Sequence, residues 1–182
     1  MKLEEARVLA DRACRILACF CDRVEVAGSI RRGKAEVGDV DIVVLPKAMI
    51  LPGAGLFGAA RVTADQAWNE LIPLAFKKSC FLVEASGKAL LRCAFLVHGF
   101  QVDIYRARPE TWGVILLVRT GSKEHNVKLC TLARLKGLKL SAAEGVVDQD
   151  GFGWVLACRS EEEIFAALGL SYVEPKDREV RF

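Results

Sequence analysis

Apolar and charged positions alternate at three- and four-residue steps near the start of the chain. The apolar positions at this spacing are Leu3, Ala6, Leu9, Ala10, Ala13, Leu17 and Phe20. Because such residues share one face of an α-helix, the pattern predicts an amphipathic helix over residues 3–20. Val24-Glu25-Val26 alternates like a short strand, and Val40 to Leu45 is a near-continuous apolar run of strand length. The polar, Gly- and Arg-rich segment 28–38 between them predicts a loop.

Apolar runs of strand length continue beyond residue 50, separated by turn residues. Residues 51–60, with three glycines and a proline, predict a hairpin or loop, and residues 64–76 have a helical spacing that Pro73 interrupts. Three strands are predicted over Phe81 to Glu84, Leu90 to Val97 and Phe100 to Tyr105, with turns at Ser86-Gly87 and His98-Gly99. The first two thirds of the chain therefore predict a mixed sheet backed by helices.

The pattern becomes helical after residue 108. Two helices are predicted over residues 110–118 and 123–136, with a break at Thr120-Gly121-Ser122. In the second helix, Leu129, Leu132 and Leu135 lie three residues apart on one stripe.

The last segment predicts a hairpin around Asp150-Gly151, followed by a short helix to Leu168 that opens with the capping box Ser160-x-x-Glu163. We therefore predict an α+β (mixed α/β) fold in two parts. Residues 1–108 hold the helix-backed sheet, and residues 109–182 form a smaller helical and hairpin subdomain.

The net charge of the chain is small, but its basic residues are clustered in one segment. The 182 residues carry 26 Lys and Arg against 23 Asp and Glu, so the net charge of +3 does not by itself call for a polyanionic partner. Residues 119–139 contain six basic residues against Glu124 alone, a local charge of 6 − 1 = +5. Any surface for a polyanion is expected in this segment.

The cysteines and apolar runs exclude several classes of protein. The seven cysteines are an odd number without a C-x-x-C pair, which favours buried thiols over a disulfide framework or a zinc cluster. Charges interrupt the N-terminal apolar positions, unlike a signal peptide, and no run approaches the ~18 apolar residues of a membrane span. We expect a soluble, intracellular, monomeric protein that does not contact a membrane.

Candidate metal-binding chemistry begins at Asp39-Val40-Asp41. Carboxylates two residues apart on a strand project from one face, and hard cations such as Mg²⁺ take several carboxylate oxygens together. Asp103, in another short apolar strand, could complete a site of three carboxylates. A solvated turn with Asx capping stays open for the first two acids, and an edge-strand charge for Asp103.

Phosphate-binding chemistry lies just upstream. Gly28-Ser29 follows a predicted strand, and backbone N–H groups in a glycine turn can cradle phosphate oxygens. Arg31, Arg32 and Lys34 add cations suited to the β and γ phosphates of a nucleoside triphosphate. Metal-binding and phosphate-binding groups thus share one loop.

In this ordered set the sequence resembles the family X DNA polymerases, from about Val24 to Arg178. The motifs are Gly28-Ser29-Ile30-Arg31-Arg32-Gly33-Lys34, Gly38-Asp39-Val40-Asp41, Val102-Asp103-Ile104, Thr120-Gly121-Ser122 with Asn126, Ser160 to Phe165, and Glu174-Pro175-Lys176-Asp177-Arg178. The resemblance implies a nucleotidyltransferase-type palm sheet and a C-terminal subdomain that selects the nucleotide. It also implies two Mg²⁺ ions, with Mn²⁺ as a substitute, bridged by Asp39 and Asp41, and Asp103 on the catalytic ion.

The resemblance assigns roles to further residues. The triphosphate would contact Gly28, Ser29, Arg32 and Gly38, while Gly121 would pass close to the incoming sugar and Asn126 would reach the minor-groove edge of the incoming base. DNA would be held by Arg31, Lys34, Lys123, Lys128, Arg134 and Lys136. Val118-Arg119 stands where the family usually carries aromatic residues that check the sugar, and Gln101 replaces an arginine beside the third acid.

The function implied is a metal-dependent, DNA-directed DNA polymerase that joins a dNTP to a primer 3′-hydroxyl on primer-template or gapped DNA. With 23 residues before the first strand, the chain resembles a minimal viral form without the lyase subdomain of larger members. A template-independent or small-molecule nucleotidyltransferase stays open, and so does a catalytically silent DNA-binding module. The basic segment and Asn126 argue against a small acceptor, and three intact acids argue against a silent module.

Overall fold

The main sheet has the strand order β1-β2-β7-β6-β5. The structure is a computed structural model that describes residues 1–52, 58–148 and 154–179. The strands of this sheet are β1 (Cys21–Val26), β2 (Val40–Pro46), β5 (Phe81–Ser86), β6 (Leu90–Phe95) and β7 (Phe100–Arg106). β2 and β7 run parallel, and the other neighbours are antiparallel. The predicted mixed sheet, and with it the α+β fold class, is confirmed.

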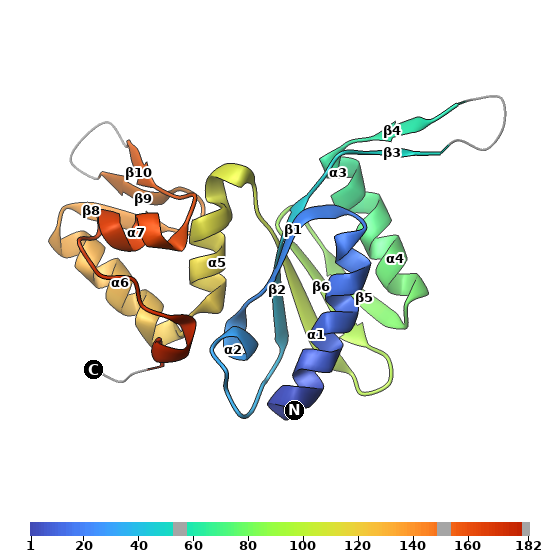
Figure 1. Cartoon of the computed structure of the whole chain (residues 1–182), viewed down its shortest axis with the longest axis horizontal. Helices are drawn as coiled ribbons and strands as arrows, with labels where there is room; N and C mark the ends of the chain where they lie inside the picture. Colours follow the sequence, from blue (N-terminus) through green and yellow to red (C-terminus); the bar gives the residue numbers. More distant parts are fainter. Residues whose placement is uncertain (53–57, 149–153, 180–182) are drawn as a thin grey trace.

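Helices α1 (Leu3–Ala18) and α4 (Ile72–Lys78) cover one face of this sheet (Figure 1). α3 (Ala64–Gln66) and a π-helical turn (Ala67–Leu71) lead directly into α4. The helical path therefore continues through Pro73, because this proline lies in the first turn of α4, where its fixed φ angle is tolerated. Within the described residues, no helix is long and apolar enough to cross a bilayer.

One segment predicted as a loop contains a helical turn, and the segment predicted as a hairpin or loop is flanked by two paired strands. The segment after β1 begins with a one-turn helix, α2 (Gly28–Arg31), in which Gly28 takes a φ of 59° and Ile30 is buried. A positive φ turns the chain sharply, so the turn of α2 can bury one apolar residue within a polar segment. Further along, β3 (Met49–Leu51) and β4 (Ala60–Val62) pair as antiparallel strands. Part of the predicted glycine-rich loop, residues 53–57, lies outside the described residues.

The second half of the chain packs around its own core. Its elements are a 3₁₀ turn (Pro109–Thr111), α5 (Trp112–Thr120), α6 (Lys123–Leu135), β8 (Leu138–Ser141), β9 (Gly145–Asp148), β10 (Val155–Ala157), α7 (Glu161–Ala167) and a 3₁₀ turn (Pro175–Asp177). Val114 and Leu117 of α5 pack with Leu129 of α6 and Phe165 of α7. α5 lies between this core and the main sheet (Figure 1).

The predicted C-terminal hairpin is part of a sheet of three described strands, β10-β9-β8. The chain already turns back between β8 and β9, where Ser141 pairs with Gly145, and this turn was missed from the sequence. The predicted turn at Asp150-Gly151 lies outside the described residues. Ser160 is the N-cap of α7 and accepts a hydrogen bond from the Glu163 N–H at 3.1 Å. Glu163, however, accepts from Arg159 N–H, so the reciprocal half of the capping box is displaced by one residue.

The predicted leucine stripe of α6 is wrong at its end. Leu129 is buried, but Leu135 is 78% exposed, and the buried positions of this helix are His125, Leu129 and Ala133. Steps of three residues rotate by about 60° each around a helix of 3.6 residues per turn, whereas steps of four keep closer to one face. The core therefore follows the four-residue spacing.

A buried carboxylate ties the two halves together. Glu161 of α7 accepts hydrogen bonds from both terminal nitrogens of Arg31, Nη1 and Nη2, at 2.9 and 2.8 Å, and from Arg178 at 2.7 Å. Arg31 follows the first strand of the main sheet, and Arg178 belongs to the C-terminal segment. Burial by itself would raise the pKa of Glu161, but the hydrogen bonds from the two arginines outweigh it and hold the pKa below the ordinary value. Glu161 is thus charged in the folded protein.

Replacing Glu161 by Gln should destabilise the protein by about 3 kcal/mol near neutral pH, because a buried arginine loses its counter-charge. The native pKa lies below the ordinary 4.5, so this stabilisation is complete above 4.5 and is lost as the pH falls through the lower native value. Urea unfolding across this range should show the two proteins converging toward acid. Glu162→Gln, on the exposed side of the same helix, should be nearly neutral; a constant difference at all pH values would contradict the assignment.

Candidate active site

Three aspartates meet at one end of the paired strands β2 and β7. The parallel register sets Asp41 beside Asp103, and Asp39 lies two residues before Asp41 at the entrance to β2. Carboxylate oxygens of the three residues lie within 4.8 Å of one another. Val40, Ile42 and Val44 point into the core beneath α1, so the alternation of β2 leaves the acids on the opposite face.

The electrostatics of this cluster call for a cation. Burial, followed by the charges of Asp39 and Asp103, raises the pKa of Asp41 to about 7. Carboxylate oxygens gathered in this way are the ligand set that Mg²⁺ and other hard divalent cations take. The residues therefore fit a divalent metal ion, with Asp39, Asp41 and Asp103 as its ligands.

Glycine is required at residue 28 because the acidic cluster lies close to residues 28–34, the segment predicted to bind phosphate and here called the phosphate loop. A Cβ atom at this position would lie 2.1 Å from the Asp41 carboxylate oxygen, and the φ angle of 59° is one that other residues rarely adopt. The backbone of α2 can therefore approach the acids only without a side chain at residue 28.

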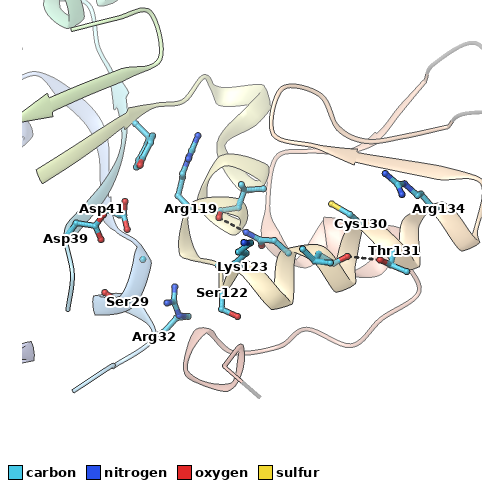
Figure 2. A pocket seen from close by; sticks show the side chains of 16 residues that line it. Ser29, Arg32, Asp39, Asp41, Arg119, Ser122, Lys123, Cys130, Thr131 and Arg134 are labelled. Atoms are coloured by element: carbon cyan, nitrogen blue, oxygen red, sulfur yellow. Dashed lines mark hydrogen bonds between the residues drawn. The ribbon is translucent and has the colours of Figure 1, made fainter. Parts of the chain in front are cut away.

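A cleft of about 660 Å³ opens beside the acids (Figure 2). Its lining comes from both halves of the chain and includes Gly28, Ser29, Arg32, Asp39, Asp41, Tyr105, Val118, Arg119, Gly121, Lys123, Asn126 and Arg134. In Figure 2, Asp39 and Asp41 face Arg119 across the cleft, and the lining continues along α6 through Cys130 and Thr131 to Arg134. The cleft therefore extends beyond the three acids along α6.

Two polar atoms in this lining are buried and have no hydrogen-bond partner among the described residues, the Ser29 hydroxyl and the Asn126 side-chain oxygen. The other end of the Asn126 amide donates to the Val118 carbonyl at 2.9 Å, which fixes the orientation of this side chain. Because buried polar atoms normally have partners, the unpartnered pair points to a polar ligand in the cleft.

Of the two remaining glycines predicted to bind the nucleotide, one lines the cleft and the other does not. Gly121 lines the cleft at the C-cap of α5, with a φ of 72° and a cis peptide bond to Ser122. Gly38 does not line it, although the chain there leads directly to Asp39. The structure therefore brings five of the six predicted residues to the cleft: Gly28, Ser29, Arg32, Gly121 and Asn126.

The cations of the phosphate loop have a protein partner. Glu179 forms ion pairs with Arg32 and, at 2.9 Å, with Lys34. Arg32 also donates to the Thr120 carbonyl at the end of α5. A carboxylate from the C-terminal segment thus lies where the sequence predicts phosphate oxygens.

The predicted DNA-binding residues do not share one surface. Arg31 is engaged by Glu161 and by the Thr120 hydroxyl at 2.8 Å, and Lys136 donates to the Leu168 carbonyl at 2.5 Å. Lys123 and Arg134 lie on the cleft-lining face of α6, whereas Lys128 is exposed on another side of that helix. Of the six predicted residues, Lys123 and Arg134 line the cleft, and the DNA-binding role of all six stays a prediction.

Arg119 does not extend freely into solvent. Its guanidinium carbon lies 4.0 Å from the centroid of the Tyr105 ring, the geometry of a cation–π contact. Burial, followed by the charges of Asp41 and Asp103, raises the pKa of Tyr105, so its phenol stays protonated and can donate to these acids. The aromatic ring near the predicted sugar position therefore comes from β7 rather than from α5.

Sequence reasoning missed four residues that shape this site: Arg92, Tyr105, Glu161 and Glu179. Tyr105 carried a usable signal, because it lies two residues after Asp103 and therefore shares its strand face. Glu161 and Glu179 contact residues more than a hundred positions away, and the contact of Arg92 depends on the register of the β6–β7 hairpin.

Comparisons with known proteins agree with this architecture. The family model "DNA polymerase beta thumb" matches residues 115–179. The DNA polymerase/3'-5' exonuclease PolX of Bacillus subtilis (strain 168) is 28% identical over 154 residues, which are 84% of this chain and 24% of that protein. The chain thus spans about a quarter of the length of this relative.

Among solved structures, the ternary P/T complex of Leishmania infantum polymerase beta superposes with a TM-score of 0.74 at 19% identity, covering 98% of this chain and 76% of that chain. This likeness establishes the fold. The chain is thus similar in sequence to DNA polymerases of family X, and it shares the fold of polymerase beta.

Proposed function

We propose that this chain is a metal-dependent DNA polymerase that transfers a nucleotide from a dNTP to a primer 3′-hydroxyl. The observation that carries the proposal is the cluster of three carboxylates within 4.8 Å at one end of a cleft with unpartnered polar atoms. The PolX relative is described as a DNA polymerase and 3'-5' exonuclease, and the Leishmania structure as a ternary complex, which supports the same reaction class.

In the proposed mechanism, Asp39, Asp41 and Asp103 would hold two divalent ions, Mg²⁺ or Mn²⁺. When bound, such ions stabilise the attacking and leaving oxygens of an in-line displacement. The 3′-oxygen attacks the α-phosphorus, the bond to pyrophosphate breaks, and Asp103 accepts the hydroxyl proton. Ser29 and Arg32 bind the phosphates, with Arg32 exchanging Glu179 for a phosphate oxygen. The chain positions and neutralises its substrates, which is most of what phosphoryl transfer needs.

The two halves take different parts in this proposal. Residues 1–108 act as the palm that carries the acids, and residues 109–182 select the nucleotide and contact DNA. The cleft continues along α6 to Arg134, beyond the space beside the acids, and this extension favours a polynucleotide over a small acceptor. Primer-template or gapped DNA, bound by a monomer in repair synthesis, is the substrate that matches this shape.

The direct test is extension of a labelled primer with and without template, using each dNTP singly. Extension that follows the template supports the proposal, whereas equal extension without template favours a template-independent transferase. Binding of DNA without any extension would leave a silent DNA-binding module.

Asp103→Asn should reduce primer extension by about 10²–10³-fold, because it removes a metal ligand and the proton acceptor, worth several kcal/mol in the transition state. DNA affinity should stay nearly unchanged, since Asp103 is 2% exposed and meets no phosphate in this mechanism. Rapid-quench kinetics and fluorescence anisotropy measure the two quantities. Asp11→Asn, on the exposed face of α1, is the charge-matched control. Extension at the wild-type rate by purified Asp103→Asn would contradict the assignment.

Replacing both Lys123 and Arg134 by Ala should make DNA binding less sensitive to salt. Each phosphate contact contributes about −0.9 to the slope of log K against log salt, so the slope should become shallower by about 1.8. Anisotropy titrations between low and moderate salt measure it. Removing Lys77 and Lys78 at the end of α4, away from the cleft, should leave the slope unchanged; an equal effect would show that charge alone, not this surface, matters.

Arg119→Phe should increase discrimination against ribonucleotides. A rigid ring excludes a 2′-hydroxyl, whereas Arg119 can donate a hydrogen bond to it, and a steric exclusion of about 3 kcal/mol corresponds to roughly a hundredfold selectivity. The measurement compares kcat/KM for dGTP and rGTP opposite cytosine in both proteins. Thousandfold selectivity in the wild type, equal to about 4 kcal/mol, or an unchanged ratio in the variant, would refute this role.

A further inference from the structure

Arg92 lies on β6 directly opposite Asp103 of β7 in the antiparallel register. Its Nε donates to Asp103 Oδ1 and its Nη2 to Oδ2, both at 2.8 Å. Such a two-pronged contact fixes a carboxylate in one orientation as well as pairing its charge. The Arg92 side chain is 40% exposed and Asp103 only 3%, so the guanidinium reaches the buried acid from the solvent side.

The other donors to Asp103 all approach the same oxygen. Gln101 Nε2 donates to Oδ2 at 3.1 Å, and the Tyr105 hydroxyl donates to it at 3.3 Å. Among the described residues, Oδ2 therefore accepts three hydrogen bonds and Oδ1 one. Because each carboxylate oxygen offers about two lone pairs, the unused acceptor capacity is on Oδ1.

The charge of Arg92 is unfavourable for a metal site taken by itself. A positive group beside a metal ligand repels the incoming cation. Among the described residues, no arginine or lysine donates a hydrogen bond to Asp39 or Asp41, so these two acids supply negative charge that is not paired in this way. The benefit of Arg92 must then lie in orientation rather than in recruiting the ion.

We infer that Arg92 is a positioning residue that fixes the Asp103 carboxylate and leaves Oδ1 available to a divalent ion or to the proton of the attacking hydroxyl. The inference rests on the proposed function. It assigns to β6, a strand without a predicted site residue, a direct part in setting the geometry of the third acid.

Residue 101 offers a way to move the guanidinium without removing it. Gln101 lies on β7 two residues before Asp103, hence on the same strand face, and its side chain already reaches Oδ2. An arginine there can contact the same carboxylate from the neighbouring position. Arg92→Ala combined with Gln101→Arg therefore restores the contact from a different strand.

The experiment measures two quantities in parallel, the single-turnover extension rate at saturating DNA and dNTP, and the affinity for Mn²⁺ alone by calorimetry. Arg92→Ala should lower the rate about 10–100-fold, as is typical of groups that orient metal ligands, with an unchanged apparent affinity for dNTP. Its affinity for Mn²⁺ should be equal or higher, because a repelling charge is gone. Gln101→Arg in the Arg92→Ala background should recover most of the rate.

Controls separate positioning from folding. Arg106→Ala removes a strand arginine that pairs with Asp65 away from the cleft, and it should change neither quantity. If Arg92→Ala does not fold, Arg92→Lys keeps the charge without the two-pronged contact and should be slow with unchanged Mn²⁺ affinity.

Wild-type or higher rates in both Arg92 variants, a parallel loss of Mn²⁺ affinity, or no rescue by Gln101→Arg would each overturn the inference. Activity of Asp103→Asn reports separately on the proposed function. An inactive Asp103→Asn with a fully active Arg92→Ala refutes only the role of Arg92.

Discussion

Mutual repulsion among Asp39, Asp41 and Asp103 is the constraint around which this fold is arranged. Their oxygens lie within 4.8 Å, and burial makes the repulsion stronger by lowering the local dielectric. The parallel pairing of β2 with β7 sets the distance, and the apolar face beneath α1 holds both strands in place. The energy stored in this arrangement is what a divalent cation would release on binding. Before a metal binds, other interactions in the protein must therefore hold the three carboxylates together against their repulsion.

The end of α5 links those other means to the cleft. Arg31 donates to the Thr120 hydroxyl, and the adjacent Arg32 donates to the Thr120 carbonyl, so the phosphate loop and the turn at Gly121 share one residue. Glu161 also holds Arg31, accepting hydrogen bonds from both of its terminal nitrogens. The groups that we propose bind the nucleotide are therefore positioned by a buried ionic network as well as by apolar contact. A change of charge within this network should affect both halves of the chain.

Local pattern predicted most helices and strands and the positions of the three acids, but it did not predict which side chains the acids contact. The helical spacing of α1 and the alternation around Asp41 depend only on neighbouring residues, so they could be predicted. A two-residue turn at His98-Gly99 would pair Val97 with Phe100 and set Ala94 opposite Asp103. The actual turn begins after Phe95, which pairs with Phe100, and it moves the register by two residues to bring Arg92 there. The length of this turn depends on how the two strands pack against the rest of the fold, and the local sequence does not reveal that packing.

Charge counting likewise cannot show which cations the protein itself already engages. The sequence assigns Arg31, Lys34 and Lys136 to a polyanion, yet each binds an oxygen of the protein itself, and the partners lie more than thirty residues away in the chain. A cation is available to a ligand only where the ligand offers more than the partner it displaces. Glu179 offers one carboxylate to Arg32 and Lys34, whereas a triphosphate offers several charges and a rigid spacing of oxygens. The ion pairs with Glu179 keep Arg32 and Lys34 ordered in the free protein. A ligand that replaces Glu179 must therefore carry at least as much negative charge as this carboxylate.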